Sequence, residues 1–288
     1  MKHYYIIYYV LLLVITACSS EVPEAVVDDS PRLLNLQIGA IPNSFATRAD
    51  ELHPGKTSWT LGDGVYTYIR FFDETGKEMT AFKRTVHQTM REVGVERHFV
   101  LDTEFDNTLP LNAKTVVATS FHSNDTTFTF SFDDNSISFR DTTSGYHDMV
   151  ISSDTVALGY KHDTIFINSW RHPMSRIKVV SEDSTHITLK SINVPKTYSL
   201  QTGEFTYTRY KIVDTYCSTA NDGFYEYDNQ TGKTYCCAFF YGMWDKDEYI
   251  LTYTGDDIVD ALPTFVGKPS DASKAGVSYL IDLRNTSE

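Results

Sequence analysis

The side chains most able to do chemistry are nine histidines and 38 aspartates and glutamates. Two histidines stand directly before an aspartate, at His147-Asp148 and His162-Asp163. Neighbouring residues on a strand point to opposite faces, so neither pair makes a base with its orienting carboxylate. The chain also lacks the GxSxG, HExxH and P-loop patterns that place nucleophiles, metals and phosphates. The sequence therefore predicts a non-enzymatic protein with no catalytic residue and no cofactor.

Paired carboxylates occur at Asp133-Asp134 and Asp256-Asp257, both in turn-like stretches. Clustered oxygens suit Ca²⁺, but the spacing matches no calcium-binding loop. We therefore expect solvated turn residues and no metal site. His172 precedes Pro173 between two predicted domains, and we expect it to be a structural histidine.

Three of the four cysteines lie late in the chain, at Cys217, Cys236 and Cys237. Because Cys236 and Cys237 are neighbours on a predicted strand, at most one of them can reach Cys217. The sequence leaves two alternatives open: a single disulfide that involves Cys217, or three buried free thiols. No spacing of cysteines and histidines indicates zinc.

The fourth cysteine, Cys18, ends an apolar N-terminal stretch. Residues 1–17 have a positive start, an uncharged middle and small residues at the end, which is typical of a signal peptide. The run is shorter than the roughly 20 residues of a membrane-spanning helix. "LVITAC" (13–18) resembles a bacterial lipobox, which implies cleavage before Cys18 and acylation of that residue. Polar residues 19–35 would then be the tether of an exported lipoprotein.

The composition excludes one class of partner and favours one class of fold. The net charge is −13, and a surface that acidic repels the phosphates of nucleic acids. The 19 tyrosines and 17 phenylalanines suit pleated, half-buried sheets.

In "AFFYGMWDKDEY", Tyr241, Trp244 and Tyr249 surround a predicted hairpin tip. These three rings either stack on a carbohydrate or fill a core.

Strand-like alternation recurs after residue 64, and no long segment has the 3.6-residue period of a helix. Many short strands joined by polar turns predict sandwiches, and the length favours two in tandem. The predicted strands are 65–72, 127–132 with 137–141, 176–180, 186–190, 205–213, 234–244, 249–254 and 276–284, with one or two helical turns possible at 256–262. The predicted organisation is a signal peptide (1–17), a tether with an N-terminal strand (18–48), a first β-sandwich (49–164) and a second β-sandwich (165–288).

Several stretches, taken in order, resemble the fimbrillin family of Bacteroidales-type fimbrial subunits and related surface lipoproteins. They are "TRADELHPGKTSWTLGDGVYTY" (47–68), "VVATSFHS" (116–123), "HDMVISSDTVALG" (147–159), "IFINSWRHPMSRIKVV" (165–180), "INVPKTYSLQTGEF" (192–205) and the closing "AGVSYLIDL" (275–283). The second stretch lacks the Pro and Tyr that the family carries there. The resemblance covers most of the mature chain. It implies an all-β protein with two tandem Greek-key β-sandwich domains of transthyretin-like type.

The resemblance also implies assembly by strand exchange. In that family an Arg-specific protease releases an N-terminal strand, and a strand of another subunit fills the groove. Mapped here, cleavage follows Arg48 and leaves Ala49 as the new N-terminus. The removable strand is 33–41, or a permanent strand if the chain is an anchor or tip subunit. The C-terminal strand is either the donor or a displaced strand. The alternating residues of the two strands are Leu34, Leu36 and Ile38, and Val277, Tyr279, Ile281 and Leu283.

The sequence thus predicts a structural and adhesive subunit of a fimbrium, or pilus. It would be a palmitate-bearing lipoprotein of the cell outer membrane, exposed at the surface. Its partners would be other fimbrial subunits and, in cell adhesion, a host or bacterial surface ligand. The alternative is a monomeric outer-surface lipoprotein that binds glycans.

Overall fold

The computed structural model describes residues 31–41, 57–102, 104–123, 128–139, 148–181, 185–217, 224–244, 250–254, 262–267 and 271–284. The chain divides into two units, Met1–Pro31 and Arg32–Glu288, and every element named below belongs to the second. The described residues form strands and one short 3-10 helix, which confirms the predicted all-β class. None of the described segments is a helix with the length and apolar character that crossing a membrane requires.

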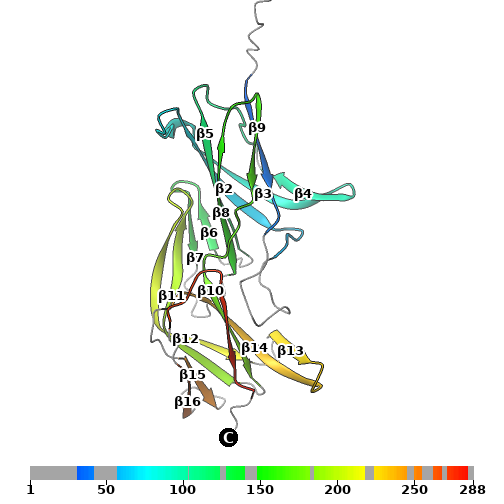
Figure 1. Cartoon of the computed structure of the whole chain (residues 1–288), viewed down its shortest axis with the longest axis vertical. Helices are drawn as coiled ribbons and strands as arrows, with labels where there is room; N and C mark the ends of the chain where they lie inside the picture. Colours follow the sequence, from blue (N-terminus) through cyan, green and yellow to red (C-terminus); the bar gives the residue numbers. More distant parts are fainter. Residues whose placement is uncertain are drawn as a thin grey trace, which may run out of the picture. The chain divides into compact units, whose positions relative to one another are not determined.

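A five-stranded antiparallel sheet organises the first part of this unit (Figure 1). Its spatial order is β4-β3-β2-β5-β8. In the sequence, η1 (Thr80–Phe82) comes between β2 and β3. Alternate residues along each strand point to opposite faces, so the sheet has two separate surfaces to cover. The strands are β2 (Gly64–Phe72), β3 (Arg84–Val93), β4 (Glu96–Leu101), β5 (Thr115–Ser123) and β8 (Met149–Ala157).

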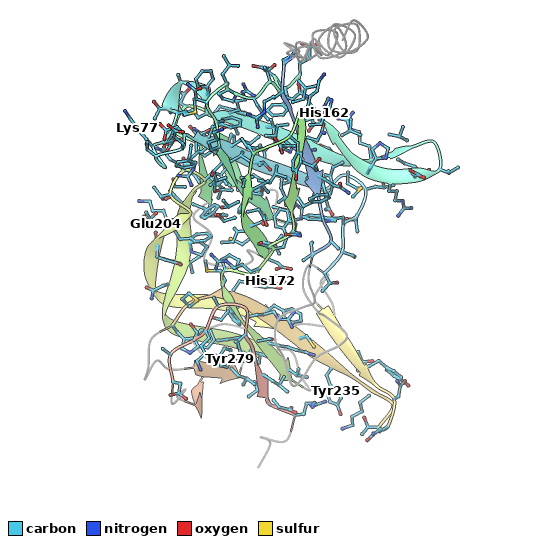
Figure 2. The ribbon with its side chains drawn as sticks, turned by 45° about the horizontal axis from the view of Figure 1, so that its top comes forward. Lys77, His162, His172, Glu204, Tyr235 and Tyr279 are labelled. Carbon is cyan, nitrogen blue, oxygen red and sulfur yellow. The ribbon has the colours of Figure 1, made fainter. Side chains whose placement is uncertain are left out.

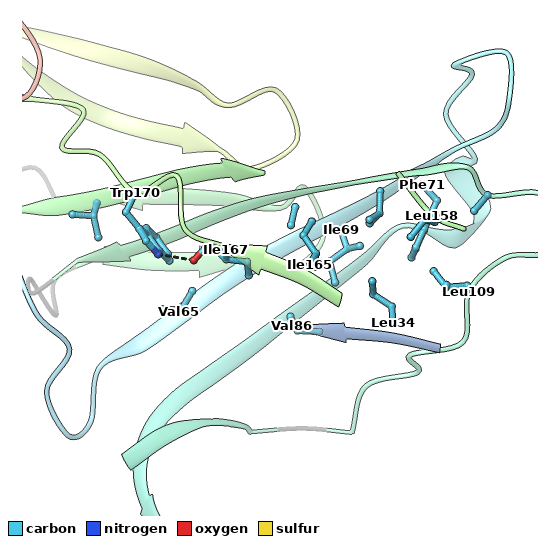
Figure 3. Close-up of a cluster of buried hydrophobic side chains, with 14 of the residues drawn as sticks. Leu34, Val65, Ile69, Phe71, Val86, Leu109, Leu158, Ile165, Ile167 and Trp170 are labelled. Atoms are coloured by element: carbon cyan, nitrogen blue, oxygen red, sulfur yellow. Dashed lines mark hydrogen bonds between the residues drawn. The ribbon is translucent and has the colours of Figure 1, made fainter. Parts of the chain in front are cut away.

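One face of this sheet is covered by β1 (Leu33–Ile38) and β9 (His162–Ile167), which pair in parallel. Figure 3 shows this first core, in which Leu34 of β1 lies among side chains of the larger sheet. Trp170 follows β9 and packs into the same core. Its indole nitrogen donates a hydrogen bond of 2.9 Å to the carbonyl of Ile167, which fixes the chain as it leaves β9 (Figure 3).

The opposite face is covered by the hairpin of β6 (Phe128–Ser131) and β7 (Ser136–Phe139) and by the facing ends of two long strands. These are β11 (Thr185–Ser199) and β12 (Glu204–Cys217). Tyr198 of β11 lies in this second core, where burial raises the pKa of its hydroxyl to about 12.

A four-stranded sheet of order β13-β14-β10-β17 organises the rest of the unit. A further sheet has the order β16-β15-β11-β7-β6, with β12 paired to β11. Core residues on β10 alternate between the two faces of the four-stranded sheet, so it too is covered on both sides. The remaining strands are β10 (Ser175–Ser181), β13 (Phe224–Asp228), β14 (Lys233–Gly242), β15 (Ile250–Thr254), β16 (Leu262–Gly267) and β17 (Ser278–Asp282).

The described chain passes from the first core to the later sheets after Trp170. Residues 164 and 165, between which the second sandwich is predicted to begin, lie inside β9, which pairs with β1. The β6–β7 hairpin also joins the sheet of the later strands, because Thr197–Ser199 of β11 pair with β7. Most of the possible helical turn at 256–262 lies outside the described residues.

Burial of Phe71 provides a test of the first core. Phe71 is fully buried, whereas Leu111 is 92% exposed. Phe71→Ala should lower the free energy of unfolding by about 3–5 kcal/mol, because a large cavity is left in a packed core. Leu111→Ala, the matched control, should change it by less than about 0.5 kcal/mol. Urea unfolding measures both, and equal effects would contradict the assigned core.

Candidate strand-exchange site

The N-terminal strand β1 is attached to the fold mainly along one edge. Leu33–Ile38 pair residue by residue with His162–Ile167 of β9. On the other edge only the start of β1 has backbone partners, since the Leu34 amide donates to the carbonyl of Asn107 at 2.8 Å. Within the described residues, no strand pairs with the remainder of that edge. β1 is therefore an edge strand that reaches the first core through its side chains.

The predicted alternation in β1 is present in the structure. Leu34 is 1% exposed, and Leu36 and Ile38 pack against the same core while partly buried. Asn35 and Gln37 point outward and are exposed. Fully burying a leucine or isoleucine contributes roughly 1.5–3 kcal/mol, so this face of β1 is a substantial part of the core.

Arg32, immediately before β1, fixes the beginning of the strand. Its Nη2 lies 3.2 Å from Oδ2 of Asp163, whose side chain is 3% exposed. Its Nε donates to the carbonyl of Tyr160 at 3.1 Å. Asp163 also accepts hydrogen bonds from the amides of Gly159 and Tyr160. Because the carboxylate is buried, loss of the arginine would leave it poorly compensated.

Trp59 fixes the other end of β1 from beyond residues 42–56, which lie outside the described residues. Its indole nitrogen donates to the carbonyl of Gly39 at 2.8 Å. The Gly39 amide donates to the carbonyl of Ile167 at 2.9 Å. A Cβ atom at Gly39 would lie 3.0 Å from the Cβ of Asn168, so the close approach of the two chains favours glycine there. The Trp59 ring makes an edge contact with Trp170 at 5.2 Å.

The other predicted exchange strand is β17, which pairs in parallel with β10 at the end of its sheet. Tyr279, Ile281 and Leu283 pack against the third core, formed with β10 and β14, and Tyr279 is labelled in Figure 2. Val277 is partly buried and precedes the strand. Among the described residues, the two parallel pairings are thus made by the first strand and the last one.

Several predicted site residues lie outside the described residues: Cys18, Arg48, Ala49, His147, Tyr249, Asp256 and Asp257. Cys236 and Cys237 are buried on opposite faces of β14, as predicted for neighbours. The side chain of Cys217 is not described, so its pairing stays a prediction.

Of the two alternatives for these rings, carbohydrate stacking or core filling, the structure shows core filling for Tyr241 and Trp244. They are 8% and 5% exposed and lie in the cores on the two faces of the four-stranded sheet. In the described residues β14 pairs with β10 and β13, whereas β15 pairs with β11 and β16, so the hairpin predicted around these rings is wrong.

The remaining chemical candidates have structural positions. Asp134 accepts hydrogen bonds from the Ser136 amide and hydroxyl and so stabilises the β6–β7 turn. His172, between β9 and β10 (Figure 2), is buried with Nδ1 3.2 Å from Oδ1 of Asp148. The described residues contain no group of three or more His, Cys, Asp or Glu arranged to hold a metal.

A polar cluster that the sequence did not indicate lies on β3 and at the end of β4. Asp102 accepts a hydrogen bond from the Thr89 hydroxyl at 2.6 Å and contacts His87 Nδ1 and Arg91. Burial lowers the pKa of His87, although Asp102 opposes this. Burial alone would raise the pKa of Asp102, but Thr89 and the charges of His87 and Arg91 outweigh it and lower that pKa.

Arg32 and Trp59 were also missed as site residues. Arg32 and Asp163 are 131 positions apart, so no local pattern could pair them. Trp59 was identified only as part of a family motif. In the sequence, only the short interval between Arg48 and Trp59 indicates that Trp59 lies just after the predicted cleavage site.

Comparison with known proteins gives a fold but no family. No protein-family model matches the chain, and no curated protein matches it in sequence. A solved "putative cell adhesion protein" from Bacteroides uniformis is similar, with a TM-score of 0.52, 12% identity and coverage of 90% of this chain and 94% of that one. A protein of the same description from Bacteroides fragilis has a TM-score of 0.48, 10% identity and coverage of 87% and 92%. The fimbrial anchor protein Mfa2 from Porphyromonas gingivalis has a TM-score of 0.39, 12% identity and coverage of 82% and 83%. At these identities, the likeness to the Bacteroides uniformis protein shows a shared fold.

Removing Arg32 should loosen β1 selectively. Arg32→Ala should speed amide hydrogen exchange in β1 by about tenfold. The reason is that leaving a buried polar group without its hydrogen-bond partner costs roughly 1–3 kcal/mol of stability. Exchange in β10, which makes no contact with Arg32, should stay unchanged. Arg97→Ala, at an exposed arginine of β4, is the matched control. Uniform acceleration of both strands would indicate global destabilisation and contradict a local role.

The polar cluster predicts a stability that declines on acidification. The pKa of His87 lies below its usual 6.5, so the unfolded chain takes up this proton first as the pH falls through 6.5. The lowered pKa of Asp102 adds a second decline as the pH falls through 3.8. His87→Phe should remove the upper decline from urea unfolding curves, whereas His98→Phe, at an exposed histidine, should retain it. An unchanged pH profile in His87→Phe would contradict this assignment.

Proposed function

We propose that this chain is a non-enzymatic, adhesive subunit of a cell-surface fimbria that assembles with other subunits by β-strand exchange. It is exported as a lipoprotein of the outer membrane and tethered through acylated Cys18. Cleavage after Arg48 then separates β1 from the rest of the chain, with Ala49 as the new N-terminus. Its ligand would be a molecule on a host or bacterial surface.

The observation that carries this proposal is the way in which β1 completes the first core. The strand contributes Leu34, Leu36 and Ile38 to that core, yet its connection to β2 runs through the segment that contains Arg48. No hairpin ties β1 to its neighbour, because it pairs in parallel with β9. A single cut therefore turns β1 into a separate peptide held by noncovalent contacts.

Departure of β1 would expose both apolar side chains and the backbone edge of β9. Such an edge pairs readily with an incoming strand, whose main chain supplies hydrogen bonds and whose alternate side chains fill the vacated positions. An incoming strand that keeps the present register runs parallel to β9 and carries apolar residues at every second position. The strand at 277–283 has that alternation in Tyr279, Ile281 and Leu283. A head-to-tail contact of this kind produces a filament.

The fold similarity to the Bacteroides uniformis protein, which is described as a cell adhesion protein, supports an adhesive role. A monomeric glycan-binding surface lipoprotein is the second candidate. It predicts that β1 stays permanently in place and that acylated Cys18 remains the N-terminus.

The test is the state of the N-terminus in protein isolated from its own cell surface. Mass spectrometry should find Ala49 as the terminal residue in SDS-resistant material of high mass. Arg48→Ala should abolish both the new terminus and the high-mass material, whereas Arg97→Ala should change neither. If every molecule instead begins at acylated Cys18, that result would contradict the strand-exchange mechanism and favour the monomeric alternative.

A further inference from the structure

Four rings form a continuous row beside the β6–β7 hairpin, and this aromatic row comprises Phe132, Phe130, Tyr66 and His87. Phe132 is 63% exposed and meets Phe130 edge to face, with ring centroids 4.6 Å apart. Phe130 stacks on Tyr66 at 4.4 Å, and Tyr66 stacks on His87 at 4.2 Å. The row therefore leads from an exposed ring to the polar cluster around Asp102.

The topology explains why this row reaches the surface. Tyr66 of β2 and His87 of β3 are direct partners in the sheet and point to the same face. β6 is the last strand of its sheet in the described part of the chain, so no described strand of that sheet lies beyond it. Beyond it, Thr89 and Arg91 of β3 continue on the face that carries His87. Arg91 is exposed, with 54% of its side chain accessible.

The row is held in position before any ligand binds. Asn135, in the β6–β7 turn, accepts a hydrogen bond from the Thr85 hydroxyl of β3 through its side chain. Its backbone carbonyl accepts one from the Leu200 amide at 2.9 Å. These contacts join the turn that carries Phe132 to the neighbouring strands. A preformed arrangement of this kind loses little conformational entropy on binding.

We infer that the aromatic row and the Asp102–Arg91 pair form a binding site for a neutral saccharide. A sugar ring has a face of C–H groups, which packs against an exposed aromatic ring such as Phe132. Its hydroxyls can bond to Asp102 and Arg91, and hydrogen bonds to ionised groups are stronger than neutral ones. Because the charges of Asp102 and Arg91 compensate each other, the polar end favours an uncharged ligand. This inference rests on the adhesive role proposed above and names its ligand class.

The test is direct saccharide binding by the full protein, purified from its own cell surface in detergent. A glycan array first identifies binders, and calorimetric titration with a neutral oligosaccharide so identified then compares variants. Phe132→Ala should weaken binding about tenfold, or about 1.4 kcal/mol, because the saccharide loses its aromatic contact. Phe132→Tyr should keep the affinity, because it keeps the ring. Tyr227→Ala is the matched control, at an aromatic residue of β13 that is 53% exposed, and it should bind normally.

The outcome separates this inference from the proposed function. The site is overturned if no saccharide on the array depends on Phe132 for binding. It is also overturned if Phe132→Ala and Tyr227→Ala weaken binding equally. Binding of extended peptides that requires Phe132 would assign the surface to a protein partner and also overturn it. High-mass assembly in Phe132→Ala is measured in parallel. Assembly without saccharide binding rejects the site alone, whereas saccharide binding without assembly rejects strand exchange alone.

Discussion

The parallel pairing of β1 with β9 is the constraint on which the first core depends. The five-stranded sheet carries apolar clusters on both faces, so each cluster needs a cover that excludes water. One cover comes from the β6–β7 hairpin with the ends of β11 and β12, all tied to the chain by tight turns or long ladders. The other comes from β1 and β9, and half of it is a six-residue strand without a hairpin. Arg32 and Trp59 compensate by fixing its two ends.

The two parallel pairings of the described chain hold their strands differently from the antiparallel pairings. Antiparallel neighbours joined by a short turn stay close even when their hydrogen bonds open, whereas parallel neighbours are joined through distant segments. β1 and β17 are both terminal strands and both lie at sheet edges, so each can leave without opening a hairpin. Strand exchange and a stable monomer can therefore use the same fold. In the proposed mechanism, the difference between them is one cleaved bond.

Alternation of apolar and polar residue types in the sequence predicted several of the strands. Phe128 and Phe130 alternate with polar residues, and the β6–β7 hairpin lies where the pattern placed it. β5 and β8 carry runs of apolar and small polar residues without clear alternation and were not found by that pattern. β10 is buried along its whole length but was predicted, because Arg176 and Lys178 alternate in sequence with Ile177 and Val179. The Arg32–Asp163 contact and the stacking of Tyr66 on Phe130 join distant segments. Such contacts follow from topology, which local periodicity does not encode.

The most direct test of the central claim is to lock β1 in place. Asn35 and Thr164 are direct partners in the β1–β9 pairing, and cysteines at both positions should form a disulfide. High-mass, SDS-resistant material should be absent while Asn35→Cys/Thr164→Cys is oxidised and should appear after mild reduction, with each single variant assembling normally. Equal assembly of the oxidised and reduced double variant would show that β1 need not leave, which would contradict the account.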